Sequence, residues 1–94
     1  MKYTNHKQAT DFNPELCSTI AMEECSELIQ AISKAKRGKL DVDNLAEEIA
    51  DVFLTIEWVT EIYDIDITEI MKWKHQKENR VVERLNKGEF NVNR

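Results

Sequence analysis

Glycine and proline are nearly absent from this chain, and this limits its fold more than any other feature of the sequence. Only two glycines and one proline occur in 94 residues. β-Sandwiches and β-barrels need many tight turns, and a doubly wound α/β fold needs glycine-rich turns and a longer chain. Hydrophobic residues make up 41% of the chain, too many for a disordered protein. The composition therefore predicts one all-α domain of amphipathic helices.

The first main helix is predicted over residues 14–37. Asn13 can cap its start, Pro14 suits its first turn, and Gly38 suits the residue that follows its end. Between these signals, apolar residues recur at helical spacing, which gives the helix one apolar stripe. The stripe is expected to pack into the core and includes Leu16, Cys17, Ile20, Ala21, Cys25, Leu28 and Ile32.

Two further helices follow the same logic. One is predicted over residues 44–63, after a cap at Asp41 or Asp43, with an apolar stripe along its length. Another is predicted over residues 66–87, because Asp66 begins a capping-box pattern.

The chain is predicted to be a single domain, residues 1–94, with a terminal segment on either side of the three main helices. Residues 1–12 are expected to form an arm or a short helix, and residues 89–94 a tail. A domain of this length buries only about 60–65% of its unfolded surface, so a monomer would have a thin core. We therefore expect an antiparallel bundle of three main helices that is completed by oligomerisation.

Charge and cysteine content disfavour several classes of protein. The formal net charge is −5, whereas a nucleic-acid-binding module is normally basic. Cys17 and Cys25 lie eight residues apart on one helix, about 12 Å along its axis, which is too far for a disulfide. They are predicted to be small core residues. No apolar segment is long enough for a secretory signal or a membrane span, so we expect a cytoplasmic protein.

Four carboxylates lie where an amphipathic helix rarely places them. Glu24 and Glu27, three residues apart, share the edge of the first apolar stripe, and Glu48 and Asp51 repeat this arrangement on the second helix. Like charges at this spacing repel each other, and partial burial increases the cost. Two such pairs on neighbouring helices therefore indicate a bound cation, although an ordinary solvated acidic face is the simpler alternative.

The chemical type of the donor atoms indicates which cation would bind. Four carboxylates without a nearby His or Cys form an all-oxygen site, which favours Mg²⁺, Mn²⁺ or Ca²⁺ over zinc. Mg²⁺ in such sites keeps several waters and is commonly shared with substrate phosphates. Four carboxylates could hold up to two such ions, one of which would orient a nucleophilic water.

The same residues resemble a known signature. EECSEL at residues 23–28 and EEIADV at residues 47–52 resemble the EExxE and EExxD motifs of the MazG-like nucleoside triphosphate pyrophosphohydrolases, which belong to the all-α NTP pyrophosphohydrolase superfamily. The resemblance covers about residues 14–85 and is strongest to short, single-domain members from phages and their hosts. It implies hydrolysis of an NTP or dNTP at the α-phosphorus, which yields the monophosphate and pyrophosphate.

The resemblance also implies roles for individual residues. Mg²⁺, with Mn²⁺ as a substitute, would be held by Glu24, Glu27, Glu48 and Asp51. Glu27 is the first choice for the general base and Glu24 the second. Because a triphosphate is strongly anionic, an acidic pocket accepts it only together with the metal.

Phosphate contacts are implied for the third helix, where a solvated basic face is the alternative. Glu78 interrupts the Lys-x-x-Lys-Asn spacing that some relatives carry. The candidates are Lys74, Lys77, Asn79, Arg80 and Arg84.

Aromatic residues could stack on the base, although core or interface packing is the favoured explanation for them. Trp58 and Trp73 are the candidates for stacking, together with Tyr63. Relatives form homodimers or homotetramers, and the resemblance implies the same here.

Two other functions compete with the enzyme. One is a non-catalytic helical adaptor whose acidic face binds a basic protein. The other is nucleic-acid binding through the basic helix at residues 72–84, which the net charge disfavours.

Overall fold

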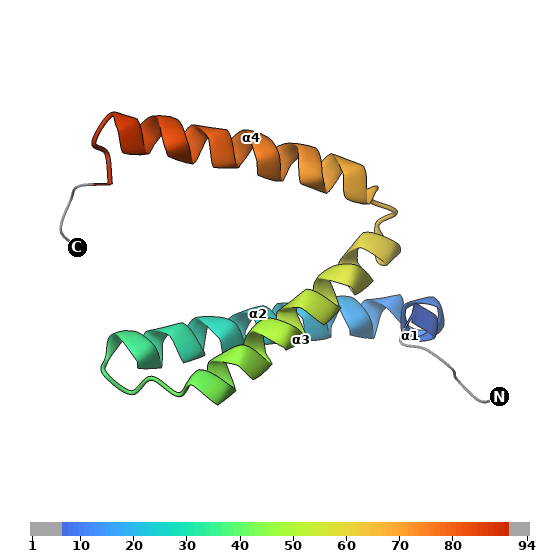
Figure 1. Ribbon diagram of the computed structural model, residues 1–94. Coiled ribbons are helices and arrows are strands. Elements are labelled where there is room, and N and C mark those ends of the chain that lie inside the picture. The colour runs from blue at the N-terminus through green and yellow to red at the C-terminus, as the bar shows by residue number, and fades with distance from the viewer. Residues whose placement is uncertain (1–6, 91–94) are drawn as a thin grey trace. The chain divides into compact units, whose positions relative to one another are not determined.

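The computed structural model describes residues 7–90, and every regular element in that range is a helix (Figure 1). The predicted all-α class is confirmed. No helix among the described residues is long and apolar enough to cross a membrane. Residues 7–12, within the segment predicted as an arm or short helix, are helical, whereas residues 1–6 and residues 91–94 of the predicted tail lie outside the described range. The helices are α1 (Lys7–Phe12), α2 (Pro14–Lys36), α3 (Val42–Ile62) and α4 (Ile67–Asn86).

The start of α2 follows the signals read from the sequence. The Asn13 side chain accepts a hydrogen bond of 3.0 Å from the backbone N–H of Leu16, and Pro14 occupies the first turn. After the helix, Gly38 has a φ of 81°, in the left-handed region that glycine adopts without strain. Both ends of α2 are therefore set by local chemistry.

The other two caps are aspartates. Asp41, rather than Asp43, caps α3 by accepting a 3.0 Å hydrogen bond from the backbone N–H of Asn44, so α3 begins at residue 42, two residues before the predicted start. Asp66 caps α4 and accepts hydrogen bonds from both the backbone N–H and the hydroxyl of Thr68. The backbone hydrogen bond, followed by the hydroxyl, lowers the pKa of Asp66.

The described chain divides into two compact units, which we treat separately. Residues 1–64 form the first unit, in which α2 and α3 make an antiparallel hairpin and α1 contacts both helices. Residues 65–94 form the second unit, which contains α4. The position of α4 in a three-helix bundle stays a prediction.

Small side chains dominate the buried interior. Among the described residues, the buried hydrophobic side chains are Cys17, Ala21 and Ala31 of α2. Thr55 of α3, which is 2% exposed, and Thr10 of α1 are the buried polar ones. Small residues allow helices to approach closely, so this interior brings the backbones of α2 and α3 together and leaves their larger apolar side chains outside.

The predicted core of α2 is therefore partly wrong. Cys17 is buried as predicted, but Cys25 is exposed, and Leu16 and Ile32 are 52% and 45% exposed. The periodicity places these residues on the apolar side of α2, but α3 covers only part of that side. Ala31, one turn after Glu27, is buried as well.

Candidate metal centre

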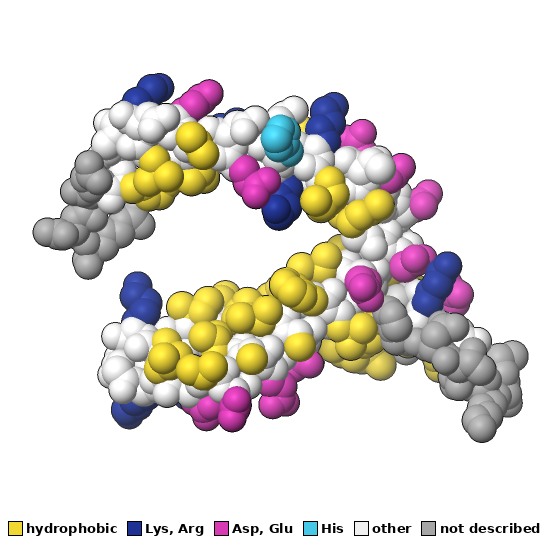
Figure 2. All heavy atoms as spheres, in the orientation of Figure 1, with side chains coloured by type: hydrophobic (Ala, Val, Ile, Leu, Met, Phe, Trp, Pro, Cys, Tyr) yellow, Lys and Arg dark blue, Asp and Glu magenta, His cyan; other side chains and the backbone are white. Residues whose placement is uncertain are grey.

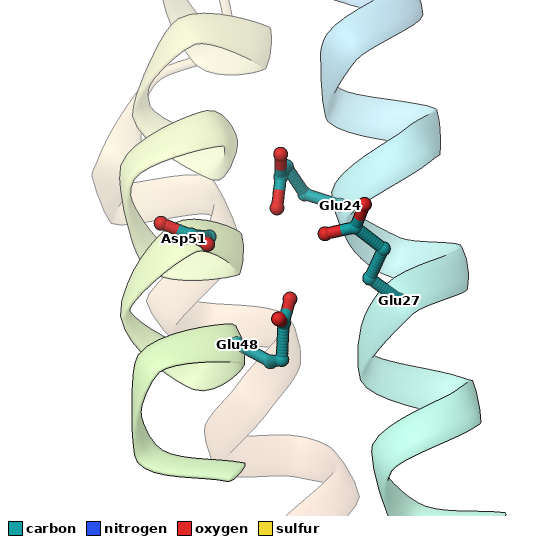
Figure 3. A group of neighbouring side chains, drawn as sticks. All are labelled: Glu24, Glu27, Glu48 and Asp51. Atoms are coloured by element: carbon teal, nitrogen blue, oxygen red, sulfur yellow. The ribbon is translucent and has the colours of Figure 1, made fainter. Parts of the chain in front are cut away.

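The hairpin brings the four predicted carboxylates together. Glu24 and Glu27 lie one turn apart on α2, and Glu48 and Asp51 lie one turn apart on α3. One carboxylate oxygen from each residue lies within 4.8 Å of the corresponding oxygens of the other three. Figure 3 shows the side chains of the two helices facing the space between them. The arrangement surrounds a single point with oxygen atoms, as a cation site requires.

Two oxygens at this point have no hydrogen-bond partner among residues 7–90. Glu24 Oε2 and Glu48 Oε2 are buried and accept no hydrogen bond from the described residues. Glu24, Glu48 and Asp51 are half-buried, whereas Glu27 is exposed. A buried carboxylate oxygen without a partner is costly, and such an atom commonly marks the place of an ion or a water. The residues therefore fit a bound cation.

The electrostatics of the centre agree with its geometry. The pKa of Glu24 is raised to about 7, chiefly by burial and in addition by the nearby charges of Glu27 and Asp51. Burial also raises the pKa of Glu48, with added repulsion from Glu27, Asp51 and Glu47. Without a cation, the surroundings therefore favour the protonated forms of Glu24 and Glu48. A divalent ion bound at this point would instead stabilise their charged forms.

The chemistry of the donors limits the choice of ion. The group consists of carboxylates alone, and among the described residues no His or Cys belongs to it. Hard cations such as Mg²⁺, Mn²⁺ and Ca²⁺ prefer oxygen donors, while zinc in proteins usually takes nitrogen or sulfur. That these four residues hold a metal remains a prediction, which the geometry supports.

Three of the predicted phosphate-binding residues of α4 have local partners. Lys74 Nζ lies 3.1 Å from Glu78 Oε2, and the Asn79 amide lies 3.5 Å from the His75 ring. Arg84 bonds Glu89 at 2.7 Å and also stacks over the ring of Phe90, with 5.2 Å to its centroid. All of these contacts are exposed and lie within the second unit.

Lys77 and Arg80 differ from the other three candidates. Neither side chain forms an ion pair or hydrogen bond within residues 7–90, and their spacing of three puts them on one side of α4. Because α4 belongs to the second unit, their relation to the carboxylates stays a prediction.

The candidate stacking residues are dispersed. Trp58 is half-buried on α3, whereas Trp73 of α4 is 57% exposed and Tyr63 at the end of α3 is 63% exposed. The two tryptophans belong to different units. Their proposed contact with a base is untested.

Sequence reasoning did not predict that Thr55, at the centre of the hairpin, is buried. Thr55 lies one turn after Asp51 and is among the most buried side chains described, with its hydroxyl donating to the Val52 carbonyl at 3.1 Å. The signal was its spacing of four from Asp51, which places both on the side of α3 that meets α2. Its internal hydrogen bond allows a polar side chain to pack there.

Comparison with known proteins agrees with this geometry. No curated protein and no solved structure matches the chain. A model of the MazG nucleotide pyrophosphohydrolase domain matches residues 12–85, a range that includes all four carboxylates and all of α4 up to residue 85. The match spans most of the sequence, and the chain therefore belongs to the MazG nucleotide pyrophosphohydrolase family.

Proposed function

We propose that the chain is a Mg²⁺-dependent nucleoside triphosphate pyrophosphohydrolase that converts an NTP or dNTP and water into the monophosphate and pyrophosphate. The observation that carries the proposal is a close group of four carboxylates. Two of their oxygens, Glu24 Oε2 and Glu48 Oε2, are buried and have no hydrogen-bond partner among the described residues. The family match supplies the reaction class. In a cell this activity would remove particular or non-standard nucleotides from the pool.

Each carboxylate has a proposed role. Glu24, Glu48 and Asp51, which are half-buried, would hold Mg²⁺ or Mn²⁺ together with Glu27. A bound ion of this kind neutralises phosphate charge and lowers the pKa of a coordinated water. Glu27 is the exposed member and the first candidate to take the proton from the attacking water, with Glu24 as the second. The water oxygen bonds the α-phosphorus while the bond to the bridging oxygen of pyrophosphate breaks.

We propose that α4 and the aromatic residues make the remaining contacts with the nucleotide. Lys77 and Arg80 are the first candidates for the leaving pyrophosphate, since neither is engaged within the described range. Lys74, Asn79 and Arg84 could join them by exchanging their exposed local contacts. Trp58 or Trp73 would stack on the base.

We also propose that the protein is a homodimer or homotetramer. The described residues bury no side chain larger than Thr and Cys, which is a small interior for a stable fold. The cytoplasmic location expected from the two free cysteines stays a prediction.

The test is pyrophosphate release from a panel of NTPs and dNTPs with Mg²⁺, with and without EDTA. Wild type is compared with Glu24→Gln and Glu48→Gln, which remove one charge each from the centre. Glu23→Gln is the matched control, because Glu23 is exposed and adjacent in sequence but outside the group. We expect the control to keep its turnover and the two variants to lose at least the roughly 10–100-fold typical of a perturbed metal site.

The outcomes separate the enzyme from its alternative. If no nucleotide of the panel yields pyrophosphate above background with either Mg²⁺ or Mn²⁺, the enzymatic function fails and the adaptor becomes the better explanation. If Glu23→Gln loses as much turnover as Glu24→Gln, the group of four is not the centre of the reaction.

A further inference from the structure

The register of α2 against α3 determines which residues flank the four carboxylates. Across the hairpin, Glu24 interacts with Asp51, and Glu27 interacts with Glu48. The two helices are antiparallel, so one turn back along α2 matches one turn onward along α3. The carboxylates therefore occupy adjacent levels of the hairpin, and the residues at the levels on either side of them can be assigned.

Both flanking levels hold small buried side chains. On one side, Ala21 lies one turn before Glu24 on α2, and Thr55 lies one turn after the carboxylates of α3. On the other side, Ala31 lies one turn after the carboxylates of α2. Ala21, Thr55 and Ala31 are 6%, 2% and 7% exposed. The carboxylates thus lie between two levels of small, buried side chains.

The larger apolar side chains of the hairpin lie outside this contact. Met22 and Phe53 are 74% and 68% exposed, and Figure 2 shows hydrophobic side chains over the surface of the first unit. Among residues 7–90, all buried side chains belong to Ala, Cys or Thr. The distance between packed helices depends on the side chains at their contact, so small side chains set the separation of α2 and α3 at the carboxylates.

Helix separation matters for a cation because ions differ in size. Mg²⁺ lies about 2.0–2.1 Å from its oxygen ligands and Ca²⁺ about 2.3–2.6 Å, so opposite ligands are roughly 0.8 Å further apart around Ca²⁺. Packed helices are separated by about 8–10 Å, depending on the side chains between them. This range exceeds the difference between the two ions. Side chains that only pack can therefore decide which ion the carboxylates fit.

The buried oxygens make the centre sensitive to this separation. Glu24 Oε2 and Glu48 Oε2, one from each helix, are buried and have no hydrogen-bond partner in the described range. Burial restricts how far such a side chain can swing to compensate for a shift of its helix. Asp51 has the shortest side chain of the four and therefore the shortest reach. A change in helix separation would pass directly to the oxygens that now lie within 4.8 Å of one another.

We propose that Ala21, Ala31 and Thr55 are positioning residues that make the centre selective for Mg²⁺ over Ca²⁺. Their small side chains hold α2 and α3 close enough for the smaller ion, and larger side chains would shift the preference toward the larger one. The inference rests on the proposed metal centre, but not on the hydrolytic reaction. In the competing explanation the three residues only stabilise the hairpin, and their substitution would weaken the binding of both ions equally.

The size of Thr55, and not its hydroxyl, is the property that the proposal uses. The hydroxyl donates to the Val52 carbonyl of the same helix at 3.1 Å, so it is satisfied without any contact to α2. Thr55→Val keeps nearly the same shape and removes the hydroxyl. We therefore expect this variant to retain the ion preference of the wild type.

The experiment measures how the full chain binds both ions. Mn²⁺ is added first, and the electron paramagnetic resonance signal of the free ion reports its binding. Displacement of Mn²⁺ by Mg²⁺ or by Ca²⁺ then gives a dissociation constant for each. The test variants are Ala21→Val and Ala31→Val. Ala46→Val is the matched control, because Ala46 is an exposed alanine of α3 that receives the same β-branched side chain.

We expect Ala21→Val and Ala31→Val to weaken Mg²⁺ binding by about tenfold, at the lower end of the usual effect of residues that support metal ligands, and Ca²⁺ binding by less. The ratio of the two dissociation constants should stay at the wild-type value in Ala46→Val and Thr55→Val. Circular dichroism confirms that each variant is helical. Where a valine variant does not fold, Ala21→Ser or Ala31→Ser replaces it and should shift the ratio in the same direction by a smaller factor.

Three results would overturn the proposal. A constant ratio in the variants at Ala21 and Ala31 would show that these residues only stabilise the hairpin, and the metal centre would stand without this inference. An equal shift in Ala46→Val or in Thr55→Val would assign the effect to helix propensity or to the hydroxyl. A wild type that binds no divalent ion would remove the metal centre and this inference together. Pyrophosphate release tests the enzymatic proposal separately.

Discussion

At the residue scale, Glu24 contributes to how the metal-free protein responds to pH. Its pKa is about 7 in the folded state, against 4.5 when unfolded. Between these values the folded chain binds more protons than the unfolded chain, so stability from this group is complete below pH 4.5 and is lost as pH rises through about 7. Glu48 shifts in the same direction. The pKa of Asp66 is lowered, so its contribution to stability has the opposite sign: it is lost as pH falls, in solution more acidic than the range in which Glu24 titrates.

We therefore expect the melting temperature of the metal-free protein, measured in EDTA by circular dichroism, to be lower at pH 8 than at pH 5. Glu24→Gln should reduce this difference, because the neutral amide carries no charge at either pH. Glu23→Gln is the control and should keep it. A melting temperature that rises over this range would contradict the electrostatic account of the centre.

Addition of Mg²⁺ should reverse the effect of high pH. An ion that binds only the folded state at 100 times its dissociation constant adds about 2.7 kcal/mol to the free energy of unfolding. We expect a rise in melting temperature at pH 8 for wild type and a much smaller rise for Glu48→Gln. A monovalent salt at equal ionic strength controls for screening. An unchanged melting temperature in wild type would show that the four carboxylates hold no ion.

The identity of these residues was readable from the sequence, but their electrostatic state was not. A spacing of three on each of two neighbouring helices predicted that Glu24, Glu27, Glu48 and Asp51 would meet, and they do. Which individual oxygens become buried without a partner depends on how closely α2 approaches α3. That approach is set by tertiary packing, which no local pattern records.

At the scale of the element, caps were predictable because they are local. The side chain of Asn13 and the backbone of Leu16 lie within one turn, so four residues of sequence contain the whole interaction. The packing surface of each helix was less predictable. Periodicity identified an apolar side on α2 but not which part of it α3 covers, so Cys25 was assigned to the core and is exposed. Thr55, a polar residue, occupies the buried position on α3.

The cap of α2 offers a test of stability. Asn13→Ala removes the acceptor for the Leu16 N–H and should lower the free energy of unfolding by about 1 kcal/mol, as for other N-caps. Asn13→Asp keeps an acceptor next to the positive end of the helix and should retain most of the stability. Denaturant titration measures both. Equal losses in the two variants would mean that the hydrogen bond is not what stabilises this end.

At the scale of the whole molecule, the acidic and the basic candidate residues belong to different units. The four carboxylates lie in the first unit, and the candidate phosphate contacts lie on α4 in the second. Sequence analysis could predict α4 as a helix with a basic side, since both properties are local. How α4 meets the carboxylates depends on contacts across units or copies, which neither periodicity nor spacing determines.

Substitutions on α4 test whether the units act on one substrate. Lys77→Met and Arg80→Met each remove a positive charge and should raise the KM for the triphosphate by about tenfold, the usual effect of one lost charged hydrogen bond. Lys72→Met is the control, an exposed charge on another side of the same helix. Steady-state kinetics at saturating Mg²⁺ measure the constants. Equal KM values for all four proteins would remove α4 from phosphate binding.

The partnerless oxygens of Glu24 and Glu48 also bear on how long the protein survives in a cell. If the four carboxylates hold Mg²⁺ as proposed, an empty centre would weaken the fold by repulsion and an occupied one would strengthen it, so copies without the ion would open more often. Proteases cut chains in their open state, and their rate follows its population when opening is fast. The same four carboxylates would then select which copies are degraded, and the cell's free Mg²⁺ would set the abundance of the protein as well as its rate.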